Sequence, residues 1–277
     1  MRKFALSSSA YTRFKLAQAI RHIALAGYSG IEVVADVPHG YPPALGEADR
    51  RGIRHALAQS RLAIANVNAS PMTAIRDELR PSWIEPDRVL RDERVQHTLD
   101  AGQLARDIGG PTITTPGGGT LEHEKARQSA ARQFRSGLKQ VVAAIEKGKC
   151  PPVLIDPGPG LLIETAAQAL DIVDGFKPPQ VAVSFNTAHF HRAGQDIGPA
   201  IRQLKDVIRH VHIEDLSADG SEDMVVPGTG LVDFAEVFDA LDAIRYQGWL
   251  TVDLSGTDVH PDDAAKQALQ YLGQFDR

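Results

Sequence analysis

Eight short apolar runs, each followed by a stretch with helical periodicity, constrain the fold of this chain more than any other feature. The runs lie at residues 3–7, 31–35, 62–68, 112–115, 153–156, 181–186, 210–213 and 250–254. Strands that alternate with helices build a parallel sheet, because each helix carries the chain back to the start of the next strand. Eight such units in about 250 residues match a closed barrel, whereas no GxGxxG follows the first run to favour an open sheet. We therefore predict an α/β fold, a (β/α)8 TIM barrel that forms one domain over residues 1–277.

The expected helices have recognisable ends. Asp233 precedes an amphipathic segment and can cap its first turn. Gly27, the pair Gly109-Gly110 and Gly248 each stand just before a new apolar run, which predicts left-handed C-caps. The longest irregular stretch, residues 69–85, exceeds an ordinary connection and predicts a lid or active-site loop.

Composition restricts the compartment and the partners. The formal net charge is −5 and the basic residues are scattered, which argues against a surface that grips nucleic-acid phosphates. Cys150 is the single cysteine, so an intrachain disulfide is excluded and a reducing compartment is favoured. The first twenty residues lack the apolar region of a signal peptide, and no run reaches membrane length. We expect a cytoplasmic protein with no nucleic-acid or membrane partner.

Four consecutive strands end in metal-ligand residue types: Asp156, Asn186, His212 and Asp253. In a barrel the chemistry sits at these carboxyl ends. Each residue also has a structural reading: Asp156 as a turn former, Asn186 as a helix cap, and His212 as a core histidine. Asp253 lies in an apolar strand, where a buried carboxylate needs a cationic partner. Together the four predict a mixed oxygen and nitrogen site for Mn²⁺, Mg²⁺, Co²⁺ or Zn²⁺.

The chain resembles the xylose-isomerase-like TIM barrels, the sugar phosphate isomerases and epimerases, a superfamily that also includes inosose dehydratases and endonuclease IV. The motifs that carry the resemblance are GYSGIEVVAD (27–36), IDPGPGLLIET (155–165), SFNTAHFHRAGQD (184–196), IRHVHIED (208–215), PGTGLVDF (227–234) and YQGWLTVDLSG (246–256). They occur in the family's order over almost the whole chain. The resemblance implies a sugar or keto-polyol substrate and, in related barrels, association as homo-oligomers.

The family's metal ligands map onto Asp156, Asn186, His212 and Asp253, and only the histidine is unchanged. Each aspartate in place of a glutamate withdraws its carboxylate by roughly 1.5 Å, so the ion must shift, water must bridge, or the backbone must close in. Asn186 in place of aspartate removes one negative charge, which predicts weaker metal binding. A divalent ion bound weakly or not at all is therefore part of the expectation.

The resemblance also implies roles in catalysis. Asp156 and Asp253 would be the acid/base pair that moves protons through an enediolate. His189 would orient the substrate, while Glu32, His39 and Asn68 would contact its hydroxyl groups. His39 and Asn68 have an alternative role, because each can also cap a loop.

Three alternatives to an isomerase or epimerase stay open. A keto-polyol dehydratase would use the same metal and proton abstraction but expel hydroxide. A catalytically degenerate barrel would only bind a sugar-like ligand, and is motivated by the three altered ligands. An endonuclease IV-like phosphodiesterase is disfavoured, because residues 216–226 contain no histidine for a multi-metal cluster.

Overall fold

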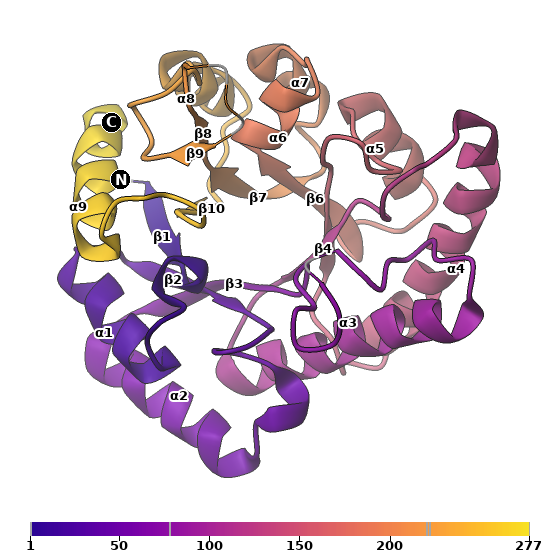
Figure 1. Ribbon diagram of the computed structural model, residues 1–277, viewed down its shortest axis with the longest axis horizontal. Coiled ribbons are helices and arrows are strands. Elements are labelled where there is room, and N and C mark those ends of the chain that lie inside the picture. Colours follow the sequence, from indigo (N-terminus) through magenta and orange to yellow (C-terminus); the bar gives the residue numbers. More distant parts are fainter. Residues whose placement is uncertain (1, 78, 220, 222, 277) are drawn as a thin grey trace.

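Eight parallel strands form a closed barrel in the computed structural model of this chain. The structure describes residues 2–77, 79–219, 221 and 223–276, so residues 1, 78, 220, 222 and 277 of the predicted domain lie outside the described part. Around the barrel the strand order is β1-β10-β7-β6-β5-β4-β3-β2, and helices form the outer ring (Figure 1). The predicted (β/α)8 architecture is confirmed.

Each barrel strand overlaps one predicted run, and no strand end differs from its prediction by more than two residues. The strands are β1 (Lys3–Ser7), β2 (Gly30–Val34), β3 (Ala63–Asn68), β4 (Ile113–Pro116), β5 (Val153–Asp156), β6 (Val181–Asn186), β7 (Ile208–Ile213) and β10 (Trp249–Val252). Every residue of β2 and β6 is buried, because helices cover the outer face and side chains fill the interior. This double burial explains why the strands appear in the sequence as continuous apolar runs.

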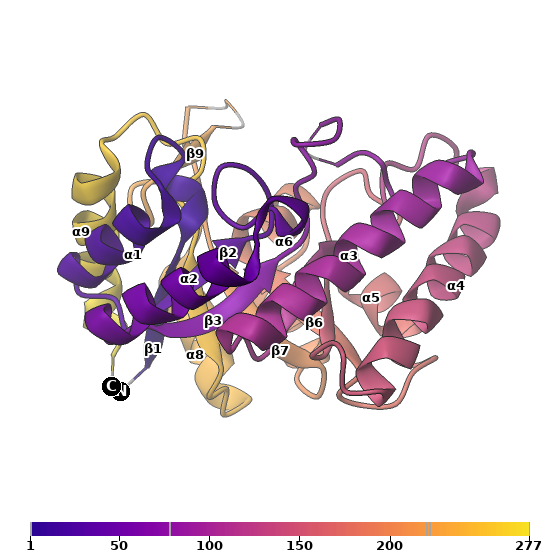
Figure 2. The ribbon, with the colours of Figure 1, turned by 90° about the horizontal axis from the view of Figure 1, so that it is seen from below.

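The outer layer consists of helices that pack their apolar faces on the barrel. They are α1 (Leu16–Leu25), α2 (Glu47–Ser60), α3 (Arg88–Ile108), α4 (Arg127–Glu146), α5 (Ala166–Val173), α6 (Thr187–Arg192), α7 (Ile197–Gln203), α8 (Phe234–Ala243) and α9 (Pro261–Leu272). A short antiparallel hairpin of β8 (Asp215–Leu216) and β9 (Met224–Val225) follows β7. The two ends of the chain lie side by side (Figure 2), and the Arg2 backbone N–H donates to Asp276 Oδ1 at 2.6 Å.

The helix ends agree with the sequence except at one glycine. Asp233 caps α8, since its Oδ1 accepts from the Glu236 backbone N–H at 3.1 Å. Gly27 and Gly109 adopt left-handed φ angles of +98° and +88°. The prediction for Gly248 is wrong: Arg245, at φ +55°, takes the left-handed position after α8. Gly248 is instead needed for packing, because a Cβ there would lie 2.2 Å from the Tyr246 hydroxyl.

The long loop between β3 and α3 is fastened by two buried charged groups. Asp36 Oδ2 accepts from the backbone N–H and the hydroxyl of Thr73, both at 2.6 Å. The fully buried Arg94 guanidinium donates to the backbone carbonyls of Ala69 (2.8 Å), Ser70 (2.9 Å) and Pro81 (2.8 Å). These contacts hold the loop over the C-terminal end of the barrel, where it lines a cavity.

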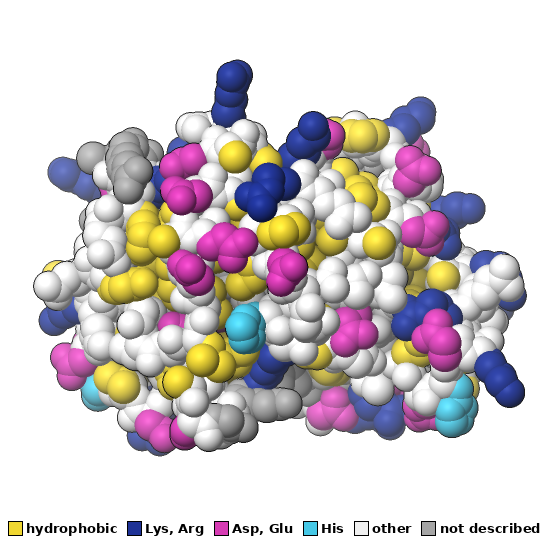
Figure 3. Space-filling model, turned by 90° about the horizontal axis from the view of Figure 1, so that it is seen from above, with side chains coloured by type: hydrophobic (Ala, Val, Ile, Leu, Met, Phe, Trp, Pro, Cys, Tyr) yellow, Lys and Arg dark blue, Asp and Glu magenta, His cyan; other side chains and the backbone are white. Residues whose placement is uncertain are grey.

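The exposed surface mixes charges of both signs. Acidic and basic side chains are interspersed on the face drawn in Figure 3, in keeping with 35 acidic and 30 basic residues in the sequence. No helix among the described residues is long and apolar enough to cross a membrane.

Candidate active site

A cavity of about 680 Å³ opens at the C-terminal ends of the barrel strands. Every barrel strand contributes a lining residue from its last positions or from the residues just after it: Ser9, Val34, Asn68, Pro116, Asp156, Asn186, His212 and Asp253. The four residues predicted as metal ligands are therefore all at one cavity. Active sites of (β/α)8 enzymes occupy this end of the barrel.

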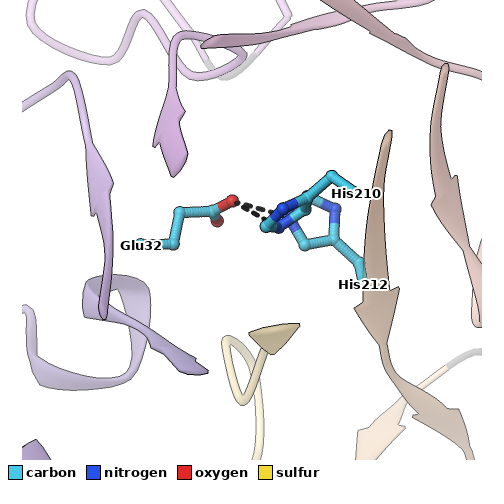
Figure 4. Close-up of side chains that lie close together, drawn as sticks. All are labelled: Glu32, His210 and His212. Atoms are coloured by element: carbon cyan, nitrogen blue, oxygen red, sulfur yellow. Dashed lines mark hydrogen bonds and ion pairs between the residues drawn. The ribbon is translucent and has the colours of Figure 1, made fainter. Parts of the chain in front are cut away.

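Glu32 lies below the cavity floor, in the interior of the barrel. Its side chain is fully buried, and Oε2 is 2.8 Å from His212 Nε2 and 3.4 Å from His210 Nε2 (Figure 4). Asn66 Nδ2 donates to the same oxygen at 2.8 Å, and Asn68 Nδ2 donates to Oε1 at 3.4 Å. Burial alone would raise the pKa of Glu32, but the two histidines hold it well below its ordinary value. Glu32 is thus a carboxylate that accepts hydrogen bonds, out of reach of a substrate in the cavity.

The ligand atoms of Glu32, His210 and His212 lie within 4.8 Å of one another, which is close enough for a metal ion. This interior position fits an ion poorly, because the asparagine amides already occupy both carboxylate oxygens. At most 2% of each side chain is exposed, which leaves little space for the water molecules that would complete the coordination shell. We therefore assign to Glu32 the role of holding His212, with Nε2 carrying the hydrogen.

The other nitrogen of His212 faces the cavity side of the barrel. Nδ1 lies 3.3 Å from Asp156 Oδ2 and 3.5 Å from the Ser184 hydroxyl. When Nε2 carries the hydrogen of a neutral imidazole, Nδ1 presents a lone pair to a carboxylate oxygen. Two electron-pair donors at this distance need a positive species beside them, either a proton or a metal ion. Burial lowers the pKa of His212, but Glu32 and Asp156 together raise it well above its usual value.

Asp156 also contacts His189, which lies on α6. His189 Nδ1 is 3.2 Å from Asp156 Oδ1 and 3.1 Å from the Pro157 carbonyl oxygen. Both partners accept hydrogen bonds, so Nδ1 carries a hydrogen and Nε2 is left for a ligand. Burial lowers the pKa of His189, but the Asp156 charge more than compensates and raises it to about 9. His189 lines the cavity, as its predicted contact with substrate requires.

Asn186 has the role of a helix cap in this structure. Its Oδ1 accepts from the His189 backbone N–H at 3.1 Å at the start of α6. Its Nδ2 donates to Glu214 Oε1 at 2.8 Å. The oxygen predicted as a metal ligand is therefore already engaged, although the side chain lines the cavity.

Asp253 stands apart from the other predicted ligands. Its Oδ1 accepts from the Ser9 hydroxyl at 2.7 Å and from the Ser255 backbone N–H at 2.8 Å. These neutral donors take the place of the cationic partner expected from the sequence. Asp156 and His212 lie 3.3 Å apart, but among the described residues Asp253 does not join them in a group whose ligand atoms are all within 4.8 Å of one another. This separation agrees with the shorter reach of aspartate.

Two residues predicted to contact substrate are also held by the protein. His39 Nε2 is 3.1 Å from the backbone carbonyls of both Tyr11 and Phe14. Asn68 Oδ1 accepts from the Ser70 backbone N–H at 2.9 Å, while its amide reaches Glu32. These hydrogen bonds stabilise the loops that carry His39 and Asn68. Both residues also line the cavity.

Glu214 is a cavity residue that the sequence reasoning did not select. It is 7% exposed and lines the cavity beside His212. Burial raises the pKa of Glu214 to about 7, and the charges of Asp253 and Asp156 act in the same direction. The available signal was its position two residues after His212, because alternate residues of a strand point to the same side.

Comparison with known proteins places the chain in a family. The family model described as "Xylose isomerase-like TIM barrel" matches residues 20–275, so the chain belongs to this family. An inosose dehydratase of Geobacillus thermodenitrificans is 28% identical over 41% of the chain and 44% of its own length, less than half of that relative. An inosose dehydratase of Lacticaseibacillus casei is 24% identical over 92% of the chain and 88% of its own length.

A solved structure extends the similarity to the whole fold. The crystal structure of a D-tagatose 3-epimerase-like protein superposes with a TM-score of 0.81 at 18% identity. The superposition covers 99% of this chain and 98% of the other. At this identity the agreement concerns the fold. The similar proteins thus include inosose dehydratases and a protein described as D-tagatose 3-epimerase-like.

Proposed function

We propose that the protein is a divalent-metal-dependent isomerase or epimerase of a sugar or keto-polyol. The observation that carries the proposal is the arrangement of carboxylates around one cavity. Asp156 and Asp253 stand on strands three places apart in the barrel order, so they approach a shared ligand from different directions. Two carboxylates in such positions suit a reaction that removes a proton from one face of a carbon and returns one to the other.

The donor set fits a divalent ion. His212 Nδ1 and Asp156 Oδ2 face each other as electron-pair donors, and Asp253 adds carboxylate oxygens at the same cavity. The Asn186 oxygen caps α6 with one lone pair and has a second one for the ion. Mixed carboxylate, amide and imidazole ligands suit Mn²⁺, Mg²⁺, Co²⁺ or Zn²⁺. A bound ion would supply Lewis-acid polarisation of the substrate carbonyl, which acidifies the neighbouring C–H.

The residues then divide the proton transfers. Asp253 Oδ2 has no hydrogen-bond partner among the described residues and can accept the proton from the substrate carbon. On its own side of the cavity, Asp156 can relay to the carbon a proton supplied by protonated His189, and the two aspartates exchange roles in the reverse reaction. His189, with Nδ1 committed to Asp156, can bind a substrate hydroxyl through Nε2. Asn68 and His39 line the cavity where the polyol chain would lie.

A keto-polyol dehydratase is the second candidate, and the relative from Lacticaseibacillus casei favours it because that similarity runs over 92% of the chain. This reaction begins with the same proton abstraction beside the carbonyl. It differs in the next step, in which the hydroxyl group on the neighbouring carbon leaves as water after protonation. His189 is placed to donate that proton. A third candidate, a barrel that only binds a sugar-like ligand, performs no proton abstraction.

Solvent deuterium exchange separates these candidates. Protein would be incubated in D₂O with ketoses and a keto-inositol, in the presence of Mn²⁺, Co²⁺, Zn²⁺ or Mg²⁺, and followed by NMR. An epimerase or isomerase incorporates deuterium and yields a stereoisomer or positional isomer, whereas a dehydratase yields a product that has lost water. Asp253→Ala should abolish exchange, and Asp239→Asn, an exposed acid on α8, serves as the matched control. Exchange that persists in chelator or in Asp253→Ala would refute the proposed mechanism.

The proposed setting follows from the same residues. We place the protein in the cytoplasm, where Cys150, a buried free thiol, would stay reduced. Its partner is a small sugar or polyol, without nucleic acid, and we expect it to form a homo-oligomer. Size-exclusion chromatography with light scattering tests the last expectation.

A further inference from the structure

We infer that Glu214 supplies the carboxylate that Asn186 lacks and is a ligand of the divalent ion in this chain. This inference rests on the proposed metal-dependent function. It assigns to the site a ligand outside the set implied by the family resemblance. The negative charge that the family has at position 186 is then supplied by Glu214.

The backbone of Glu214 is fastened to the strand beside it. The Thr187 hydroxyl donates to the Glu214 carbonyl oxygen at 2.6 Å and accepts from the Glu214 N–H at 2.9 Å. Thr187 directly follows β6, so this contact fixes Glu214 next to Asn186. The side chain therefore emerges at a defined place on the cavity wall.

The side chain of Glu214 has one engaged and one available oxygen. Oε1 accepts from Asn186 Nδ2 at 2.8 Å. No hydrogen bond to Oε2 is described, and the residue lines the cavity while being only 7% exposed. A carboxylate in so buried a position is costly to ionise unless a cation or a donor completes it. His212 Nδ1 and Asp156 Oδ2, which lie 3.3 Å apart, line the same cavity and are the other ligands that we assign to this cation.

The amide at position 186 is the counterpart of this arrangement. An aspartate there would place a second carboxylate 2.8 Å from Glu214 Oε1, where the asparagine now donates a hydrogen bond. The neutral Asn186 thus holds Glu214 in place, whereas an aspartate at position 186 would repel it. With Asp156, Glu214 and Asp253, the proposed ligand set has three carboxylates, as many as the family resemblance implies.

Reach supports the same assignment. Glutamate is one methylene longer than aspartate, which adds roughly 1.5 Å. Asp156 and Asp253 are each shorter by that amount than the glutamates implied by the resemblance. The longer side chain of Glu214 can compensate for this shorter reach and complete the coordination of the ion. By contrast, the next residue, Asp215, turns away and accepts from the backbone N–H groups of Gly228, Gly230 and Val232.

The test is a set of three variants titrated with Mn²⁺ by calorimetry, with Co²⁺ absorption as a second readout of the coordination shell. Glu214→Gln keeps the acceptor for Asn186 but removes the charge, and should weaken Mn²⁺ binding by about tenfold or more. Asn186→Asp alone should destabilise the metal-free protein through repulsion. The double variant Asn186→Asp/Glu214→Gln returns the charge to position 186 and should recover most of the affinity. Asp239→Asn should match the parent protein.

The melting temperature in chelator separates a ligand from a structural residue. Removing the charge at Glu214 should leave the metal-free protein equally or more stable, while the rise caused by Mn²⁺ shrinks. A Glu214→Gln variant with unchanged affinity, in a protein whose Asp253→Ala variant fails to bind, would overturn the inference alone. A parent protein that binds none of the four ions would overturn the proposed function and this inference with it.

Discussion

Replacing Glu32 by glutamine should destabilise the fold and weaken metal binding, although Glu32 does not touch the cavity. The carboxylate oxygen Oε2 accepts from His212 Nε2 and from Asn66 Nδ2, both at 2.8 Å. A glutamine presents one oxygen and one NH₂ group, so one buried donor must face another donor. An unpaired buried donor costs about 1–3 kcal/mol, and the loss of a buried charged partner of His212 adds to this. We expect the free energy of unfolding to fall by about 2–4 kcal/mol.

The effect on the metal follows from the tautomer of His212. Glu32 holds the hydrogen on Nε2, which leaves Nδ1 as the donor on the cavity side. Partners of this kind typically affect metal affinity by about 10–100-fold when they are removed. Urea unfolding in chelator measures the stability, and calorimetric titration with Mn²⁺ measures the affinity.

His210→Gln provides the control that identifies where the ion binds. If the ion lay between Glu32, His210 and His212, this substitution would remove a ligand and abolish binding. If Glu32 only orients His212, the affinity should stay close to that of the parent protein. A His210→Gln variant that loses the metal would show instead that the ion lies between Glu32, His210 and His212. A Glu32→Gln variant that keeps both its stability, to within about 0.5 kcal/mol, and its affinity would refute the reasoning.

Three further predictions concern stability away from the metal. Arg94→Leu should leave three loop carbonyls without their donor, lower the free energy of unfolding by about 3–5 kcal/mol, and admit trypsin to residues 69–85, as limited proteolysis would reveal. His97 is buried, and burial together with the Arg94 charge, opposed by Asp36, lowers its pKa to about 4. The unfolded chain therefore binds this proton at higher pH, so stability should fall by about 2 kcal/mol between pH 7 and pH 5; urea unfolding should show a flatter profile in His97→Gln. Asp233→Ala should cost about 1 kcal/mol through the lost cap of α8, and an unchanged denaturation midpoint would contradict it.

The fold could be predicted closely because the physical signals along the chain were local and repeated. Strands buried on both faces appear as apolar runs with sharp ends, so their limits were found to within two residues. Helix ends were less certain, because a left-handed residue after a helix need not be glycine. Arg245 takes that conformation after α8, and Gly248 serves close packing against Tyr246 instead.

The site could be predicted by position but not by side-chain direction. Strand ends converge in any closed barrel, so Asp156, Asn186, His212 and Asp253 were expected at one cavity. Which atom each residue offers depends on neighbours distant in sequence. The oxygen of Asn186 caps α6, and Glu32 meets His212 across 180 residues. Neither contact has a signature in the sequence.

Under the proposed function, a divalent cation is the partner of the carboxylates that remain around the cavity. Glu32 is matched by His212, and Asp156 by His189, in contacts of 2.8 and 3.2 Å. Glu214 and Asp253 then remain, at 7% and 9% exposure, with neutral donors as their described hydrogen-bond partners. Burial raises the pKa of Glu214 to about 7, so a divalent ion in the cavity would favour the ionised form of Glu214 and would also neutralise the charge of Asp253. Asp156, Asn186 and Asp253 are each weaker ligands than the family resemblance implies. With Glu214, the carboxylates of the proposed site would still suit a divalent ion.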